Sequence, residues 1–354
     1  MKSLDQIIKT AIAAGSSDIH ITTKRPASCR VYGTLYTLDN EPLTEEDVVA
    51  MAQPFYAIKG VREKMEAFGE ADFAYSYDDK TRFRMNMFKQ KGEHAFVMRL
   101  LPTKMPDPDD LGLPEAVKEF VETKRGLVLV TGETGCGKST TLAAILNKIN
   151  ETKQKHIITI EDPIEFIHPH KKCLVNQREL GNDTKSFSSA IRAALREDPD
   201  VVLIGEMRDL ETIETALTAA ETGHLVFATL HTNSAPSTID RIVDVFPSDQ
   251  QPQIRVQLSN VLEGIVCQQL IPLKSGKGRV AAYEIMVTNT AIKSLIRDGK
   301  SFQLTSQIQT GKKQGMQTMD DSVYKLFVDK LITAEDAERA AHDQPAMRKL
   351  CQNG

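Results

Sequence analysis

The chain has 354 residues, of which 41% are hydrophobic and 26% are charged, and this balance is typical of a globular protein with room for two domains. The formal net charge is −4, so no global basic excess attracts nucleic acid or an anionic membrane. The five cysteines form no C-x-x-C pair, and no apolar run of about 18 residues occurs. Zinc clusters, a disulfide framework and membrane spans are therefore excluded, and because the N-terminus carries early polar residues we expect a cytoplasmic protein.

The first hundred residues alternate between helical and strand patterns. Apolar residues recur at helical spacing over residues 4–12 and stop at Gly15, which predicts a short amphipathic helix. Short β-rich runs follow between residues 18 and 39. A second helix is expected after the capping signal TEED, residues 44–47.

Strict alternation returns in DFAYSYDDKTRFRMNMFKQ, residues 72–90, and predicts two strands joined by a turn at residues 78–79. Arg82 and Arg84 share one face of the second strand, and Arg99 lies on the next predicted strand. One interpretation is a solvated strand face. A sharper hypothesis is that these arginines act in trans, completing the γ-phosphate site of a neighbouring subunit in a ring.

The proline-rich segment LPTKMPDPDDLGLP, residues 101–114, is typical of an extended linker, and we place the domain boundary there. We therefore expect a smaller domain over residues 1–100 and a larger one over residues 115–354. In the larger domain, apolar strands such as GLVLVTG, HIITIEDP, DVVLIGE and HLVFATLH are separated by helical stretches, which predicts a parallel α/β sheet. After about residue 250 the pattern favours helices.

The stretch GETGCGKS, from Gly132 to Ser139, matches G-x-x-x-x-G-K-[ST] between an apolar strand and a helix. In this context backbone N–H groups and the helix N-terminus bind phosphates, while Lys138 reaches the β and γ phosphates. The Ser139 hydroxyl is the expected Mg²⁺ ligand. We therefore predict an ATP and Mg²⁺ site. Its predicted nucleotide-binding residues are Gly132, Thr134, Gly135, Cys136, Gly137, Lys138, Ser139 and Thr140.

Acidic side chains follow two of the predicted strands. ITIEDPIEF offers Glu161 together with Asp162 and Glu165, and DVVLIGE offers Glu206 after a glycine. In P-loop folds such acids lie near the metal at the carboxyl ends of the strands, although each could instead be a solvated loop acid or a helix cap. His224 and His231 stand at opposite ends of another strand, and the spacing alone leaves open which of them contacts the nucleotide.

Together these motifs resemble one family, the secretion ATPases, and within it the type IV pilus retraction ATPases. The family's N-terminal signature and arginine strand are matched by GSSDIHIT and TRFRMNMF. Its acidic Asp box, atypical Walker B motif and His box are matched by ITIEDPIEF, GEMRDLETI and TGHLVFATLHT. Its C-terminal segment associated with retraction is matched by AIKSLIRDGK and GMQTMD. The resemblance covers nearly the whole chain.

The resemblance implies a RecA-like P-loop ATPase domain preceded by a smaller α+β, PAS-like N-terminal domain, with a helical C-terminal segment and assembly into a homohexameric ring. It implies that Glu206 is the Walker B acid acting on Mg²⁺ and water, that Glu161 orients the attacking water, and that His231 contacts the γ-phosphate. It also implies that three arginines approach from the adjacent subunit, namely Arg82, Arg84 and Arg99.

The implied function is a motor that couples Mg-ATP hydrolysis to pilus disassembly and twitching motility at the cytoplasmic face of the inner membrane. The implied partners are the inner-membrane platform protein of the pilus, touched peripherally, and a second retraction ATPase. Alternatives are an accessory retraction ATPase or an extension ATPase, the latter usually with a four-cysteine zinc module. A RecA-like nucleic-acid motor is an alternative from another class, but the chain is acidic and contains no Trp. A non-hydrolysing scaffold is a further alternative, and the intact Lys138 and Glu206 argue against it.

Two positions of the loop depart from the family pattern. Glu133 replaces a proline that is often found there, and Cys136 occupies a position where serine or threonine is usual. A thiol beside phosphate-binding amides leads to the hypothesis that Cys136 is sensitive to oxidation.

Overall fold

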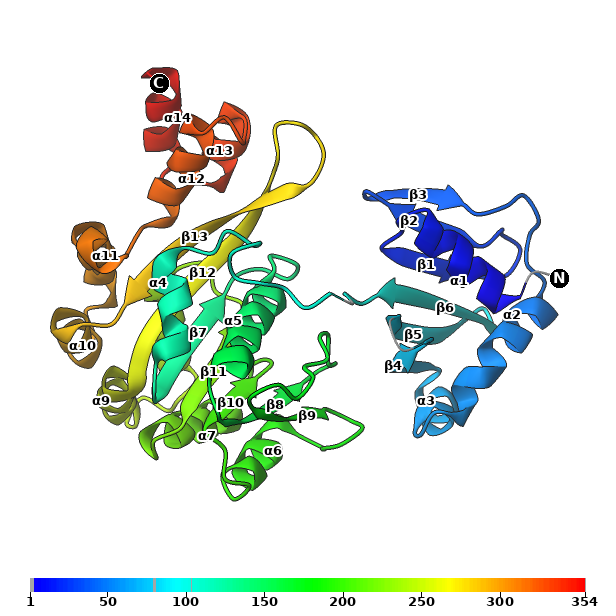
Figure 1. Cartoon of the computed structure of the whole chain (residues 1–354), viewed down its shortest axis with the longest axis horizontal. Coiled ribbons are helices and arrows are strands. Elements are labelled where there is room, and N and C mark those ends of the chain that lie inside the picture. The colour runs from blue at the N-terminus through cyan, green and yellow to red at the C-terminus, as the bar shows by residue number, and fades with distance from the viewer. Residues whose placement is uncertain (1–2, 79–80, 103, 354) are drawn as a thin grey trace. The chain divides into compact units, whose positions relative to one another are not determined.

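The computed structural model describes residues 3–78, 81–102 and 104–353, and the chain forms two compact units (Figure 1). Met1–Lys104 with Pro163–Ile167 make the first unit, and Met105–Asp162 with His168–Gly354 make the second. The division between them falls inside the segment expected to be a linker. The domain limits expected from the sequence, 1–100 and 115–354, remain a prediction.

A six-stranded antiparallel sheet in the order β3-β2-β1-β6-β5-β4 forms the first unit. Three α-helices and a short 3-10 helix pack their buried residues against it, so the smaller α+β domain expected from the sequence is confirmed. The strands are β1 (Asp18–Ile21), β2 (Ser28–Val31), β3 (Thr34–Thr37), β4 (Glu70–Ser76), β5 (Arg82–Gln90) and β6 (Glu93–Leu100). The helices are α1 (Leu4–Ala13), α2 (Glu45–Ala52), η1 (Gln53–Ala57) and α3 (Val61–Phe68).

Local signals explain the boundaries of these elements. The Thr44 side chain accepts from the Asp47 amide while the Asp47 side chain accepts from the Thr44 amide, so the predicted capping box begins α2. On β5, Phe83 and Met85 are buried in the core, whereas Arg82 and Arg84 lie on the opposite face. The turn predicted at residues 78–79 lies partly outside the described residues.

A seven-stranded sheet in the order β13-β12-β7-β11-β10-β8-β9 forms the second unit. Every neighbouring pair from β12 to β9 is parallel, which confirms the predicted parallel sheet, and β13 runs antiparallel to β12. The strands are β7 (Gly126–Thr131), β8 (His156–Glu161), β9 (Leu174–Glu179), β10 (Val201–Ile204), β11 (Leu225–Leu230), β12 (Leu262–Pro272) and β13 (Arg279–Val287).

Helices cover both faces of this sheet, and the side chains of β7 are therefore buried on both sides. Leu127 and Leu129 point into one core, and Val128 and Val130 point into the other. The second of these cores includes α4 (Glu115–Lys118), η2 (Glu119–Glu122) and α5 (Lys138–Thr152). The first core includes α6 (Phe187–Ala194), α7 (Leu210–Glu221), α8 (Ala235–Asp244) and α9 (Gln251–Val261).

The C-terminal part differs from the expectation of a mostly helical chain after residue 250. β12 and β13 are long strands that pair from Gly264↔Val287 to Pro272↔Arg279 in a hairpin drawn in yellow in Figure 1. Neither this hairpin nor β9 was predicted. β12 begins at Leu262 directly after α9 ends at Val261, so no turn residue separates the two elements in the sequence, and β9 (LVNQRE) is mostly polar. The helical C-terminal segment itself is confirmed. It comprises α10 (Thr290–Arg297), η3 (Ser301–Gln303), α11 (Leu304–Thr310), η4 (Lys312–Gln314), α12 (Met319–Val328), α13 (Ala334–Ala340) and α14 (Gln344–Asn353).

Part of the predicted linker is turned rather than extended. The Leu111 amide donates to the Asp107 carbonyl over 3.1 Å, and the Leu113 amide donates to the Pro108 carbonyl over 3.0 Å. Leu113 is buried in the core that contains α4 and α5. Apolar burial of Leu113 thus fixes the second half of this segment to the second unit. Within the part of the chain that the structure describes, no helix is both long enough and apolar enough to span a bilayer.

The first unit depends on an aromatic cluster around Phe55, which packs within 5.0–5.7 Å of the rings of Phe73, Tyr75 and Phe96. We expect Phe55→Ala to lower the free energy of unfolding of this unit by about 3–5 kcal/mol, because a buried ring is replaced by a cavity. Hydrogen exchange of the β4–β6 amides in the full chain measures this. The control is Phe68→Ala, which removes a ring that is 78% exposed and should change stability by less than about 0.5 kcal/mol. Equal effects of the two substitutions would contradict the assignment.

Candidate nucleotide site

Four neighbouring parallel strands end at one edge of the large sheet, and each end carries a predicted site residue. β7 leads into the glycine-rich loop, β11 ends before His231, β10 before Glu206, and β8 ends at Glu161. Because parallel strands place their carboxyl ends at a common edge, residues from four separate motifs meet there. The predicted arginines belong to the first unit.

The glycine-rich loop owes its shape to the close approach of β12. Gly132 and Gly137 have φ angles of 140° and 95°, which side-chain-bearing residues rarely adopt. A Cβ on Gly132 would lie 2.2 Å from the Gln268 carbonyl oxygen, and a Cβ on Gly137 would lie 2.8 Å from the Gln268 side-chain nitrogen. Glycine is therefore required at both positions by conformation and by space.

Lys138 begins α5 and folds back over this loop. Its Nζ donates to the carbonyl oxygens of Gly132 at 2.7 Å and Glu133 at 3.0 Å, and the residue is buried. Thr134, Gly135 and Ser139 are exposed on the loop and on the first turn of α5, while Thr140 is partly exposed beside them. The loop thus places an ammonium group, a helix N-terminus and exposed backbone together, a donor set that fits phosphate.

The magnesium ion expected from the sequence remains a prediction. Among the residues that the structure describes, no group of three or more His, Cys, Asp or Glu side chains is arranged to hold a metal on its own. Mg²⁺ at phosphate sites usually takes only one or two protein ligands and keeps its other positions for phosphate oxygens and water. The Ser139 hydroxyl and the Glu206 carboxylate are the residues that would supply them.

Gln268 on β12 braces the loop and was not identified from the sequence. Its Nε2 donates to the Cys136 carbonyl at 2.7 Å, and its Oε1 accepts from the Thr141 hydroxyl at 2.7 Å. The side chain is buried, so both hydrogen bonds are shielded from water. The residue lies in the segment where helices were expected, and only its assignment to a strand beside β7 could have indicated this role.

Glu206 is held by two side chains. Its Oε1 lies 2.6 Å from Arg208 Nε and 2.8 Å from His231 Nε2, and 18% of the Glu206 side chain is exposed. Burial alone would raise the pKa of this carboxyl, but the Arg208 guanidinium and the His231 imidazole outweigh burial and hold the pKa below its ordinary value. Glu206 is therefore a carboxylate at neutral pH. Arg208 was not singled out from the sequence.

The backbone on either side of Glu206 is anchored to its neighbouring strands. The Gly205 amide donates to the Ile160 carbonyl over 2.8 Å, and the Met207 amide donates to the Thr229 carbonyl over 3.0 Å. A Cβ on Gly205 would lie 3.1 Å from the Ile160 carbonyl oxygen, so the glycine lets β10 run close to β8 at this point. The glycine that precedes the acid in the atypical Walker B motif thus has a packing role.

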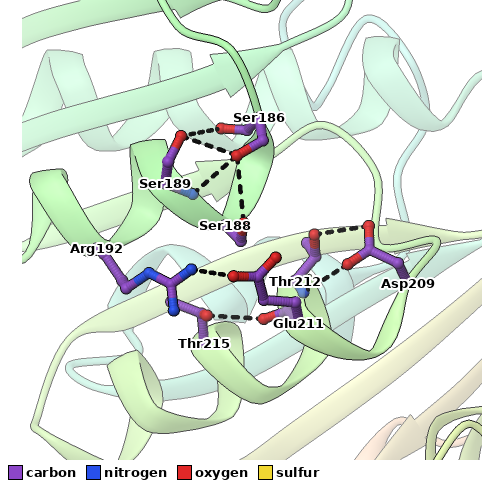
Figure 2. A network of polar contacts seen from close by, with 8 residues as sticks. All are labelled: Ser186, Ser188, Ser189, Arg192, Asp209, Glu211, Thr212 and Thr215. Carbon is purple, nitrogen blue, oxygen red and sulfur yellow. Dashed lines mark hydrogen bonds and ion pairs between the residues drawn. The ribbon is translucent and has the colours of Figure 1, made fainter.

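A polar network fixes the helix that follows Glu206 (Figure 2). Asp209 caps α7 by accepting from the Thr212 amide at 2.9 Å and from the Thr212 hydroxyl at 3.0 Å. Arg192 on α6 forms an ion pair with Glu211 on α7, as Figure 2 shows. The segment that contains Glu206 is therefore held by strands at its start and by a capped helix at its end.

Glu161, Asp162 and the two predicted histidines have different surroundings. Glu161 Oε1 accepts from the Thr159 hydroxyl at 2.5 Å and from Gln177 Nε2 at 3.1 Å, whereas Asp162 is exposed. His224 lies at the other end of β11, where its Nδ1 is 3.0 Å from the Ala219 carbonyl oxygen at the end of α7. Among the two histidines, His231 is the one at the carboxyl edge of the sheet.

The three predicted arginines lie on the polar face of the sheet in the first unit. Arg84 and Arg99 are direct cross-strand partners on β5 and β6, and Asp18 on β1 is the partner of Arg99 on its other side. Arg99 Nε donates to Asp18 Oδ1 at 2.8 Å. Arg82 Nη1 donates to the Ile164 carbonyl at 3.3 Å within the same unit. The action of these arginines in trans remains a prediction.

The structure does not favour the oxidation hypothesis for Cys136. The thiol is buried, and burial raises its pKa although Lys138 acts in the opposite direction. The thiolate is the reactive form, so a raised pKa lowers the reactivity of this residue toward oxidants.

Comparison with known proteins identifies the family. A sequence profile described as "Type II/IV secretion system protein" matches residues 1–276. The chain belongs to this family. A type IV pilus retraction ATPase, PilT, of Pseudomonas aeruginosa is 49% identical over 338 residues, which cover 96% of this chain and 98% of that protein. A twitching motility protein of Neisseria gonorrhoeae is 51% identical over 278 residues, which cover 78% of this chain and 74% of that protein.

A solved structure described as the pilus retraction motor PilT with bound ADP is similar, with a TM-score of 0.91 and 51% identity over 99% of this chain and 100% of that chain. The resemblance to the pilus retraction branch of the secretion ATPases, predicted from the motifs, is thereby confirmed, and with it the predicted class of activity, ATP hydrolysis.

In this secretion ATPase, Gln268→Leu tests the brace on the phosphate loop. We expect the dissociation constant for ADP to rise about tenfold, because two buried hydrogen bonds worth about 0.5–1.5 kcal/mol each are lost while the side-chain volume is kept. Titration with a fluorescent ADP analogue measures the change. Gln257→Leu on α9, whose side chain donates to the exposed residue Glu221 at 2.8 Å, is the matched control. An unchanged affinity in Gln268→Leu would show that the loop keeps its shape without the brace.

Proposed function

We propose that this chain is an ATP-hydrolysing motor that drives retraction of type IV pili. The observation that carries the proposal is the joining, at one sheet edge, of a phosphate loop containing Lys138 with the ionised acid Glu206 held by Arg208 and His231. Near full-length similarity to a retraction ATPase supports the direction of work.

The chain's own residues suggest how the phosphates are held. The Lys138 ammonium donates to two loop carbonyls and can exchange these acceptors for the β and γ phosphate oxygens. The N-terminus of α5 adds a favourable dipole. Ser139 and Glu206 would hold a Mg²⁺ ion, the latter directly or through water, and the ion would supply charge neutralisation during phosphoryl transfer.

Glu206 and Glu161 are the two acids proposed for catalysis. Glu206 stays ionised because Arg208 and His231 favour its charged form, so it can accept a proton from water or orient it. Glu161 follows the neighbouring strand β8 and is proposed to orient the attacking water. His231, next to Glu206 at 2.8 Å, is proposed to contact the γ-phosphate.

Assembly completes the proposal. We place six copies in a ring in which Arg82, Arg84 and Arg99 of one subunit reach the nucleotide of the next, as arginine fingers do. Domain movement driven by ATP turnover would then act on the inner-membrane platform protein of the pilus, from the cytoplasmic face, with a second retraction ATPase as a further partner. No nucleic acid is expected to take part.

Two substitutions separate binding from turnover. Lys138→Ala should weaken ATP binding about tenfold or more, because charged hydrogen bonds to phosphate contribute about 1.5–3 kcal/mol. Glu206→Gln should leave ATP binding nearly unchanged and lower kcat by about 100-fold or more, because an acid–base group is lost. ATP titration and steady-state phosphate release measure the two quantities. Glu214→Gln, on the exposed side of α7, is the control, and equal loss of ATP binding in Lys138→Ala and Glu206→Gln would contradict these roles.

The direction of work is tested in cells by deleting the gene and counting surface pili. We expect more pili and lost surface motility, restored by the wild-type gene and not by Glu206→Gln, because retraction requires hydrolysis. Cells without pili would instead indicate an extension ATPase. An unchanged number of pili would indicate an accessory motor or an unrelated ATPase.

A further inference from the structure

Glu284 is an acidic residue on β13 that is buried inside the second unit and is not among the residues assigned to nucleotide binding. Its exposed fraction is 2%, and it is the cross-strand partner of Cys267 on β12. A buried carboxylate is costly unless it is well hydrogen-bonded, so its partners indicate what it does.

Those partners are the first amides of two helices. Glu284 Oε1 accepts from the Ala235 amide at 2.7 Å, and Ala235 is the first residue of α8. The backbone amide of Met319, the first residue of α12, also lies near enough to lower the pKa of this carboxyl. Ser234 and Thr318 already cap these helices by accepting from amides further into the first turn. The caps do not use the amides of Ala235 and Met319. The Glu284 carboxyl therefore lies near the unused first amides of two helices, where the helix dipoles are positive.

Each helix leads to a different part of the molecule. The loop of residues 231–234 joins β11 to α8, so the start of α8 sets the position of His231, whose Nε2 contacts Glu206. α12 begins the C-terminal helices, and Asp320 on its first turn accepts from the amides of His342 at 2.7 Å and Asp343 at 3.0 Å, just before α14. Glu284 thus lies between the catalytic edge and the C-terminal helices.

Two further hydrogen bonds tie the start of α12 to β13. The Ile285 amide donates to the Gln317 carbonyl at 2.8 Å, and the Tyr283 amide donates to the Ser322 hydroxyl at 3.0 Å. The beginning of α12 therefore moves with β13. The Glu284 side chain connects this block to the start of α8.

Charged groups around Glu284 act in both directions. Burial raises the pKa of the carboxyl, the two helix amides and His342 oppose this, and Asp320 adds to it. The Cys267 thiol in the same cluster also has a raised pKa, because it is completely buried. Hydrogen bonding by the carboxylate oxygens, and not a surface ion pair, holds this junction together.

We propose that Glu284 is a positioning residue that couples the C-terminal helices to the His231 loop, because β13 is hydrogen-bonded to the start of α12 and the Glu284 side chain accepts from the first amide of α8. This inference rests on the proposed ATPase function for its kinetic consequence. Its structural part stands independently, because it concerns only the two helix ends.

The test compares Glu284→Gln, which keeps one acceptor oxygen, with Glu284→Met, which keeps none, in the full-length assembled protein. We expect faster hydrogen exchange at residues 231–236 and 319–321, and a kcat lower by roughly tenfold or more in Glu284→Met, since small misplacements of catalytic groups have effects of this size. The dissociation constant for ADP should change by less than about twofold, and Glu284→Gln should lie between Glu284→Met and wild type.

The matched control is Glu263→Gln on β12, where burial also raises the pKa but Lys293 and Arg125 are the nearby charges. It should leave kcat and exchange at residues 231–236 unchanged. If folded Glu284→Met turns over ATP at the wild-type rate and shows wild-type exchange at these residues, the inference is wrong. If the wild-type protein hydrolyses no ATP, the proposed function fails, whereas the exchange measurement still decides whether Glu284 joins the two helix ends.

A second comparison tests whether the C-terminal helices act through Glu284. Asp320→Asn weakens the tie between α12 and α14, and we expect it to speed exchange at residues 231–236 in the wild-type background but to add nothing in Glu284→Met. Asp321→Asn removes an acid from the same turn that pairs with Lys312 at the surface, and it serves as the control. Additive effects of Asp320→Asn and Glu284→Met would contradict coupling through this carboxylate.

Discussion

The placement of β7 between β11 and β12 is the constraint on which the rest of the ATPase unit depends. Parallel pairing on one side aligns the phosphate loop with the strand end that precedes His231, and further strands add Glu206 and Glu161 to the same edge. Pairing on the other side brings Gln268 against the loop. Because β7 is buried on both faces, its register cannot slip without exposing one of two cores, so the site inherits the rigidity of the sheet.

Charged groups at the sheet edge are satisfied internally in the structure. Lys138 donates to two loop carbonyls, and Glu206 accepts from Arg208 and His231, so none of these four contacts needs a ligand. A nucleotide has to replace the carbonyl acceptors of Lys138 with its phosphates, and a metal has to compete with a guanidinium for the carboxylate. Binding at this edge is therefore an exchange of partners, in which the difference between partners, and not the full strength of each contact, sets the affinity.

Hydrogen bonds from buried side chains connect parts of the unit that are distant in the chain. Gln268 joins β12 to the phosphate loop and to α5, and Glu284 on the adjacent strand accepts from the first amide of α8. Both lie on the β12–β13 hairpin, which was not expected from the sequence. Each strand of this hairpin therefore supplies one buried polar side chain that hydrogen-bonds outside the sheet, Gln268 to the phosphate loop and Glu284 to α8.

The sequence by itself determined the elements whose signals are local. The phosphate loop follows from glycine and lysine spacing, the strands before Glu161 and Glu206 from short apolar runs, and the separation of Arg82 and Arg84 from the core of the first unit from strict alternation. Only the tertiary structure decided that Arg208 and His231 share Glu206, and that Gln268 braces the loop. Thr141 and Gln268 are 127 positions apart, and no local pattern specifies a partner across such a distance. The hairpin escaped prediction for a related physical reason: β12 follows α9 without a turn residue and polar residues such as Gln268 interrupt its apolar run, so only its pairing with β7 marks it as a strand.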